Sequence, residues 1–211
     1  MSRLVFDLEA NGLNELVLDR KGNPLLEANR IHVMVTKDID TGSVKVYREN
    51  DIADGVGALR NADVVIGHNI ILYDIPILER SFNSIPTKAY DTLVISRMMF
   101  PDKATHPLGG NSLKAWGEYL GEYKTDYQDG WENWSQEMED YCIQDTAVTE
   151  RVYLEVYDEL AEFSQESIDL EHKVQFIIQQ QISFTSNSSN VNTTNNTITI
   201  SSHGLSTGDP V

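Results

Sequence analysis

The sequence predicts an α/β domain in which a mixed β-sheet is flanked by helices, followed by a low-complexity tail. Three observations support this fold class: short β-rich runs lead into segments with helical spacing, capping residues open those segments, and the composition changes abruptly after residue 182. At 211 residues the chain is long enough for one domain with a sizeable core. No apolar run approaches the roughly 18 to 20 residues of a membrane-spanning helix, so we expect no contact with a membrane.

The first half of the chain is typical of strands that alternate with short helices. The expected elements are a strand over residues 4–10 that ends in a turn, a hairpin formed by 31–36 and 43–47, a helix over 51–61, a buried strand over 63–67 and a helix over 73–82. Pro76 fits only within the first turn of the last helix, which therefore begins close to Asp74.

The second half is mainly helical. The expected elements are a helix over 91–99 capped by Asp91, a loop over 101–111, a helix from Ser112 to about Leu120, a long helical pattern over 136–162 opened by Ser135, and a helix over 166–181. We expect Trp116 in the core. Leu170 and Val174 share one side of the last helix.

The tail has a composition that cannot build a core. Thirteen of the fifteen residues from 183 to 197 are Ser, Thr or Asn, so this segment is expected to be a linker or a disordered tail. Alternation over 197–201 suggests a short β-hairpin there. The predicted divisions are a domain over 1–162, a helix over 163–182 and the tail over 183–211.

The chain is strongly acidic, with 33 Asp and Glu against 16 Lys and Arg and a formal net charge of −17. Simple phosphate-neutralising nucleic-acid binders have the opposite sign. The acids are either a solvated surface or, in part, ligands for divalent cations. The single cysteine, Cys142, cannot form an internal disulfide, and the first residues lack the apolar run of a secretion signal, so we expect a cytoplasmic protein.

Three motifs bring together residues suited to metal chemistry, although each has a plainer explanation. Asp7 and Glu9 lie two apart on a strand and project from one face, as metal ligands or as two solvated acids. Asp74 follows a buried strand, where it is either a third ligand or a helix cap. Tyr141 and Asp145 share a helical face, as catalytic groups or as a packing pair.

Taken in order, D-x-E, N-x-x-x-Y-D and Y-x-x-x-D resemble the three motifs of the DEDD exonuclease superfamily, tyrosine subgroup. The flanking segments DLEANGL, GHNIILYDIPIL, DTLVISRMM, SLKAWGEYLGEYK and MEDYCIQDTAVT are similar to the 3′→5′ proofreading domain of podovirus-type family A DNA polymerases. The resemblance covers roughly residues 3–180. It implies an RNase H-like fold and, if a phage encodes the chain, the cytoplasm of a bacterial host.

The resemblance also implies a mechanism that uses two divalent cations, Mg²⁺ or Mn²⁺, held by carboxylates. Carried over by motif, Asp7 would bridge both cations, Glu9 and Asp145 would hold the one that activates water, and Asp74 would help to hold the other. Tyr141 would orient the nucleophilic water. The expected products are nucleoside monophosphates released from a DNA 3′ end, single-stranded or frayed.

Four residues near the motifs are candidate contacts to the terminal nucleotide: Asn11, Leu13, His68 and Asn69. For the two asparagines and the histidine the alternative is a turn or cap role, and for Leu13 it is core packing. Aromatic residues between Tyr123 and Trp134 either stack on single-stranded bases or pack beneath an acidic loop.

The function expected from the sequence is therefore metal-dependent 3′→5′ DNA exonuclease activity in proofreading. No polymerase domain fits in the remaining residues, so the expected partners are a separate DNA polymerase chain or other replisome proteins. Two alternatives stay open: an RNA-trimming exonuclease of the same superfamily, and a non-catalytic module of the same fold that docks a replisome protein. Competition between matched DNA and RNA substrates separates the RNA-trimming alternative from the DNA exonuclease, because only the 2′-hydroxyl distinguishes the substrates.

Overall fold

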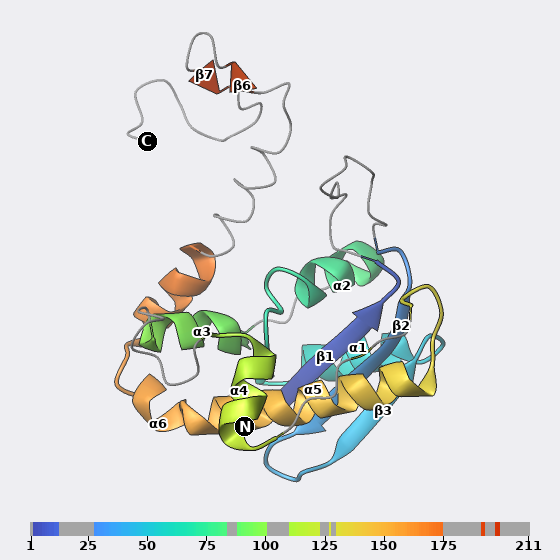
Figure 1. The fold of residues 1–211 in the computed structure, drawn as a ribbon, viewed down its shortest axis with the longest axis horizontal. Coiled ribbons are helices and arrows are strands. Elements are labelled where there is room, and N and C mark those ends of the chain that lie inside the picture. Colours follow the sequence, from blue (N-terminus) through green and yellow to red (C-terminus); the bar gives the residue numbers. More distant parts are fainter. Residues whose placement is uncertain are drawn as a thin grey trace.

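The computed structural model describes residues 2–12, 28–83, 88–100, 110–122, 127, 130–174, 191–192 and 197–198. It has a five-stranded sheet in the order β3-β2-β1-β4-β5 with helices on both faces (Figure 1). The strands are β1 (Arg3–Ala10), β2 (Ile31–Asp38), β3 (Val44–Arg48), β4 (Val64–Gly67) and β5 (Ala89–Asp91). The labelled helices are α1 (Ile52–Asn61), α2 (Asp74–Phe82), α3 (Thr92–Met99), α4 (Leu113–Leu120), α5 (Gln136–Glu155) and α6 (Tyr157–Leu160).

The sheet is mixed, as the sequence predicts. β1 and β3 run antiparallel to β2 between them, whereas β1, β4 and β5 are mutually parallel. The carboxyl ends of these three parallel strands therefore lie at the same end of the sheet, where ligand sites of open α/β sheets are found. The predicted hairpin is β2–β3, but β5 was not predicted, because three residues carry too little pattern.

The two faces of β1 belong to different halves of the core. Phe6 and Leu8 pack with residues of α1 and α2 in one buried cluster. Val5 belongs to a second cluster, which it shares with residues of α4 and α5. Since side chains alternate along a strand, Asp7 and Glu9 project toward the α5 face together with Val5.

The long helical pattern is divided in two. α5 ends at Glu155 and α6 follows after Val156, whereas the sequence predicts a helix to residue 162. The break allows Val156, Leu160 and Ile168 to pack with Val152 in one buried cluster. Tertiary packing thus overrides the local pattern.

Residues 165–174 are helical, as predicted, but the apolar side expected there is exposed. Leu170 is 61% exposed and Val174 36%, while Ile168 faces the domain. In the tail, Thr197–Ile198 pairs antiparallel with Val191–Asn192, and the other residues of the predicted hairpin lie outside the described part. Among the described residues, no helix has the length and apolar character needed to cross a bilayer.

Candidate active site

Two of the predicted carboxylates come from β1. Asp7 and Glu9 face α5, and potential ligand atoms of Asp7, Glu9 and Cys142 all lie within 4.8 Å of one another. The thiol of Cys142, on α5, donates a hydrogen bond to the backbone oxygen of Asp7 at 3.4 Å. Strand alternation therefore predicted the pairing of the two acids correctly.

The third carboxylate reaches β1 from the next parallel strand. Gly67 ends β4 at a position where a Cβ would lie 2.1 Å from Cγ2 of Ile70, so only glycine lets the chain fold back here. Asn69 follows with a φ of 66°, in the left-handed region. The turn delivers buried Asp74 to the start of α2, where its Oδ1 accepts a hydrogen bond from the backbone nitrogen of Leu8 at 3.1 Å.

Asp91 holds this turn in place. Its carboxylate accepts hydrogen bonds from three backbone nitrogens, those of Asn69 at 2.8 Å, Ile71 at 3.0 Å and Leu93 at 2.9 Å. The hydrogen bond from Leu93 makes Asp91 the N-cap of α3, as the sequence predicts. The sequence did not reveal the two bonds to the turn, because they join residues about twenty positions apart.

α5 supplies the third motif. Asp145 is buried, and its charge is one of those that raise the pKa of Asp7. Tyr141 lies one turn earlier, half-buried, and its ring contacts those of Tyr127 and Trp131, with centroids 5.9 Å and 6.4 Å away. The structure thus brings the four acids together and places Tyr141 beside them on the same helix.

The electrostatics of the cluster are unfavourable without a cation. Burial, followed by the charges of Glu9, Asp145 and Asp74, raises the pKa of Asp7 well above its usual range. Burial raises the pKa of Asp74 to about 8, although its hydrogen bond from Leu8 opposes the shift. Such perturbed acids at the end of parallel strands are typical of functional sites.

The candidate substrate contacts have structural roles as well. Asn11 accepts hydrogen bonds from the backbone nitrogens of Asn29 and Arg30, both at 3.0 Å, and so joins the end of β1 to the start of β2. Nδ1 of His68 contacts Oγ1 of Thr92 at 2.9 Å, and Asn69 forms the turn. Leu13 lies outside the described residues.

A cavity of about 560 Å³ adjoins the turn, lined by His68, Asn69, Leu93, Arg97, Gly110, Asn111, Ser112 and Leu113. Arg97 and Asn111 were not predicted as site residues. Neither stands in a motif, and only the packing of α3 against the start of α4 brings them beside His68. Cys142 was also not predicted, although it follows Tyr141 directly in the third motif.

No protein-family model matches the chain. The chain is 25% identical to DNA-directed DNA polymerases of Escherichia phage T7, over 79% of its length, and of Enterobacteria phage T3, over 84%. It spans about a third of the length of these relatives, 32% in each case.

Solved structures with a similar fold are nucleases and polymerases. Brucella melitensis NrnC matches 84% of this chain and 81% of its own with a TM-score of 0.54 and 17% identity. Escherichia coli RNase D, an exoribonuclease involved in structured RNA processing, matches 82% of this chain and 45% of its own with a TM-score of 0.53 and 14% identity. The predicted resemblances are therefore confirmed: this chain is similar to phage DNA polymerases in sequence and has the RNase H-like fold of DEDD exonucleases.

Proposed function

We propose that this chain is a divalent-metal-dependent 3′→5′ DNA exonuclease that proofreads in phage-type DNA replication. The observation that carries the proposal is the convergence of Asp7, Glu9, Asp74 and Asp145, from three separate motifs, around β1. The sequence similarity to phage DNA polymerases supports DNA as the substrate.

The residues of the cluster fit a divalent cation. Oδ2 of Asp7 is buried and has no hydrogen-bond partner in the described part of the chain, which is costly unless a cation binds there. Carboxylate oxygens are the ligands that Mg²⁺ and Mn²⁺ prefer. Burial raises the pKa of the Cys142 thiol well above its usual value, so this side chain stays a neutral neighbour of the oxygen ligands.

Each residue has a role in the proposed hydrolysis. Two bound cations would activate a water molecule and neutralise the charge that develops on the leaving oxygen. Asp7 would hold both, Glu9 and Asp145 the one beside the water, and Asp74 the other. Tyr141 would orient the water through its hydroxyl group.

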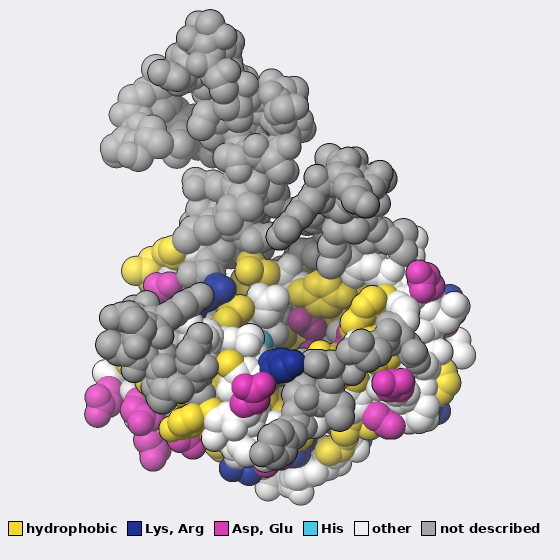
Figure 2. All heavy atoms as spheres, viewed as in Figure 1, with side chains coloured by type: hydrophobic (Ala, Val, Ile, Leu, Met, Phe, Trp, Pro, Cys, Tyr) yellow, Lys and Arg dark blue, Asp and Glu magenta, His cyan; other side chains and the backbone are white. Residues whose placement is uncertain are grey.

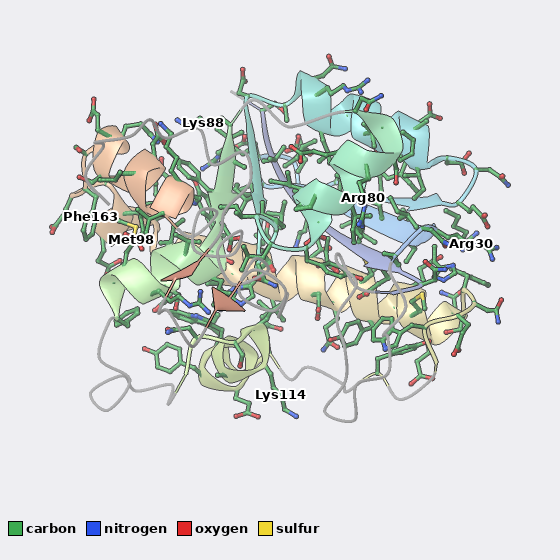
Figure 3. All side chains as sticks on the ribbon, turned by 90° about the horizontal axis from the view of Figure 1, so that it is seen from above. Arg30, Arg80, Lys88, Met98, Lys114 and Phe163 are labelled. Carbon is green, nitrogen blue, oxygen red and sulfur yellow. The ribbon has the colours of Figure 1, made fainter. Side chains whose placement is uncertain are left out.

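The net negative charge of the chain does not alone decide how it would bind a nucleic acid, because the positions of the charged side chains matter as well. Figure 2 shows acidic side chains near the middle of one face, bordered by apolar ones. The basic side chains labelled in Figure 3 are spread out, with Arg30 and Arg80 toward one end, Lys88 on another side and Lys114 on α4. We propose that the cavity beside His68 and Asn69 receives a nucleotide near the 3′ end, with Arg97 near its phosphate.

A second candidate is trimming of RNA. Its support is the fold: RNase D is an exoribonuclease, and NrnC has been solved with pGG bound. Matched DNA and RNA oligonucleotides in competition separate the two candidates, because they differ at the 2′-hydroxyl.

The domain boundaries and partners belong to the same proposal. Residues 1–162 would form the exonuclease domain, 163–182 a connecting helix and 183–211 a tail. A DNA polymerase or another replisome protein would present the 3′ end.

The test is degradation of a 5′-labelled single-stranded DNA oligonucleotide in Mg²⁺ or Mn²⁺. We expect products that shorten from the 3′ end with release of nucleoside monophosphates, and none in EDTA or with Asp7→Ala. The matched control is Asp158→Ala, which removes an exposed carboxylate on α6 and should cleave as the wild type does. An intact oligonucleotide with folded wild-type protein, or full activity in Asp7→Ala, would reject the proposal.

A further inference from the structure

An aromatic cluster packs against Tyr141. Its members are Tyr127, Trp131 and Tyr141, with ring centroids 4.6 Å apart for Tyr127 and Trp131 and 6.4 Å apart for Trp131 and Tyr141. Trp131 is 40% exposed, so burial alone does not fix the position of its ring. Whatever holds Trp131 therefore also limits where the ring of Tyr141 can lie.

The segment that carries Trp131 is tethered at several points. The hydroxyl of Tyr127 donates a hydrogen bond to the backbone oxygen of Gly130 at 3.0 Å. Arg48 lies over the ring of Trp134, 5.2 Å from its centroid, and binds both carboxylate oxygens of Glu139 on α5 at 2.7 Å and 2.9 Å. These contacts join the segment to β3 and to the first turns of α5, which lie side by side in Figure 1.

The remaining tether is a buried histidine. His32 is 1% exposed, and its Nε2 lies 3.0 Å from the backbone oxygen of Trp131. A carbonyl only accepts, so Nε2 donates, and a neutral imidazole then has an acceptor at Nδ1. That Nδ1 is buried and has no hydrogen-bond partner among the described residues. A buried acceptor without a partner lowers stability, and a phenyl ring at this position would have no such atom. What a phenyl ring would lack is the hydrogen bond to Trp131, so this bond is what the imidazole contributes.

The location of His32 links this tether to the strand that carries the acids. Glu9 pairs with Val33 and Ala10 with Ile31, so His32 is the extra residue of a β-bulge opposite Glu9 and Ala10. Bulges next to active sites redirect side chains. The bulge thus connects the strand of Asp7 and Glu9 with the segment that packs on Tyr141.

We infer that His32 is a positioning residue for Tyr141: by holding the backbone of Trp131, it fixes the aromatic cluster against which the tyrosine ring packs. The inference rests on the proposed function, in which the Tyr141 hydroxyl orients the water. It extends the site from the four acids to β2 and the 130–134 segment. His32 is buried and would act only through Trp131, so its loss should lower kcat and leave KM unchanged.

The test compares four single variants and one double variant in steady-state cleavage of single-stranded DNA. In His32→Phe we expect kcat to fall about 10- to 100-fold, as for other groups that orient a catalytic residue. His32→Gln, whose amide can donate to the Trp131 carbonyl, should recover most of this loss. Val152→Ala, which removes buried methyl groups from α5 two turns beyond Asp145, should lower Tm without lowering kcat. In Tyr141→Phe, adding His32→Phe should cause no further loss, because both changes remove the same effect.

A readout independent of cleavage is the near-ultraviolet circular dichroism of the aromatic cluster. We expect His32→Phe to weaken this signal and Val152→Ala to leave it unchanged. A wild type that does not cleave rejects the proposed function, and the dichroism then still tests the tether. An active wild type with unchanged kcat in His32→Phe, additive losses in the double variant, or an unchanged aromatic signal would overturn this inference.

Discussion

Asp7 and Asp91 lie on two parallel strands of one sheet, yet their surroundings are opposite. Burial raises the pKa of Asp91, but its carboxylate accepts hydrogen bonds from three backbone nitrogens, which stabilise its charge and limit that rise. Asp7 has a buried oxygen without such a partner, and Glu9, Asp145 and Asp74 raise its pKa further. One carboxylate therefore stabilises the fold, whereas the other lowers stability at the position of the proposed cation site.

The largest effect should come from removing the Asp7 charge. With Asp7→Asn we expect cleavage to fall about 10³-fold or more, because several kcal/mol of transition-state stabilisation are lost with the cations. The metal-free variant should nevertheless unfold at a higher urea concentration than the wild type, since a buried charge is gone. Cleavage assays and urea titrations in EDTA measure the two effects. A variant that is both inactive and less stable would contradict the comparison.

Asp91→Ala should have the reverse pattern. We expect the free energy of unfolding to fall by about 2–4 kcal/mol, because a helix cap is lost and two turn nitrogens lose their acceptor. Urea denaturation measures the change, and Asp91→Asn, which keeps one acceptor oxygen, should lose less. Equal stability of the alanine variant and the wild type would mean that the turn does not depend on Asp91.

Tyr141→Phe separates orientation from metal binding. We expect kcat to fall about 10- to 100-fold, because only the hydroxyl that orients the water is removed. Metal affinity, followed by Mn²⁺ binding in electron paramagnetic resonance titrations, should stay unchanged. A weakened Mn²⁺ affinity would instead place Tyr141 among the groups that shape the carboxylate cluster.

The pH dependence of stability should reveal the strained cluster in metal-free protein. Burial raises the pKa of Asp74 from 3.8 to about 8, so between these values the folded state keeps a proton that the unfolded chain has released. Stability therefore falls as pH rises through this window. Urea midpoints from pH 4 to 8 in EDTA should show the decline, and Asp74→Asn should reduce its slope. A decline of the same slope in Asp74→Asn would assign the effect to other groups.

The smallest effect is expected at the cavity. Arg97→Ala should raise KM about two- to fivefold with little change in kcat, which is the scale of an exposed ionic contact. Lys45→Ala, an exposed cation on β3, is the control and should leave KM unchanged. Equal KM increases in both variants would mean that only overall charge matters.

Local signals explain why much of the fold could be predicted from the sequence. Ser112 and Ser135 cap α4 and α5 because their hydroxyl oxygens accept hydrogen bonds from the backbone nitrogens of Ala115 and Met138, at 3.2 Å and 3.1 Å. Such caps stand at fixed offsets in the chain. The face shared by Asp7 and Glu9 followed from strand alternation. These features depend on neighbouring residues only.

What could not be predicted depends on residues that meet across the fold. The β-bulge at His32 is set by pairing with β1, and the contact of Trp131 with Tyr141 joins an exposed segment to α5. The helix break at Val156 likewise serves packing with Ile168. No local sequence pattern encodes contacts between residues so far apart in the chain. The carboxylates could therefore be predicted from the sequence, whereas these contacts across the fold could not.

The two edge strands of the sheet have a consequence for self-association. On β3, exposed Lys45 and Arg48 place cations along the outer strand. On β5, the backbone nitrogen of Asp91 donates to Nε2 of His172 at 2.9 Å, from the helix over 165–174. A second chain that added a strand would have to bury cations at one edge or displace an imidazole at the other. Both edges of the sheet therefore disfavour edge-to-edge aggregation, while the central strand carries carboxylates that repel one another.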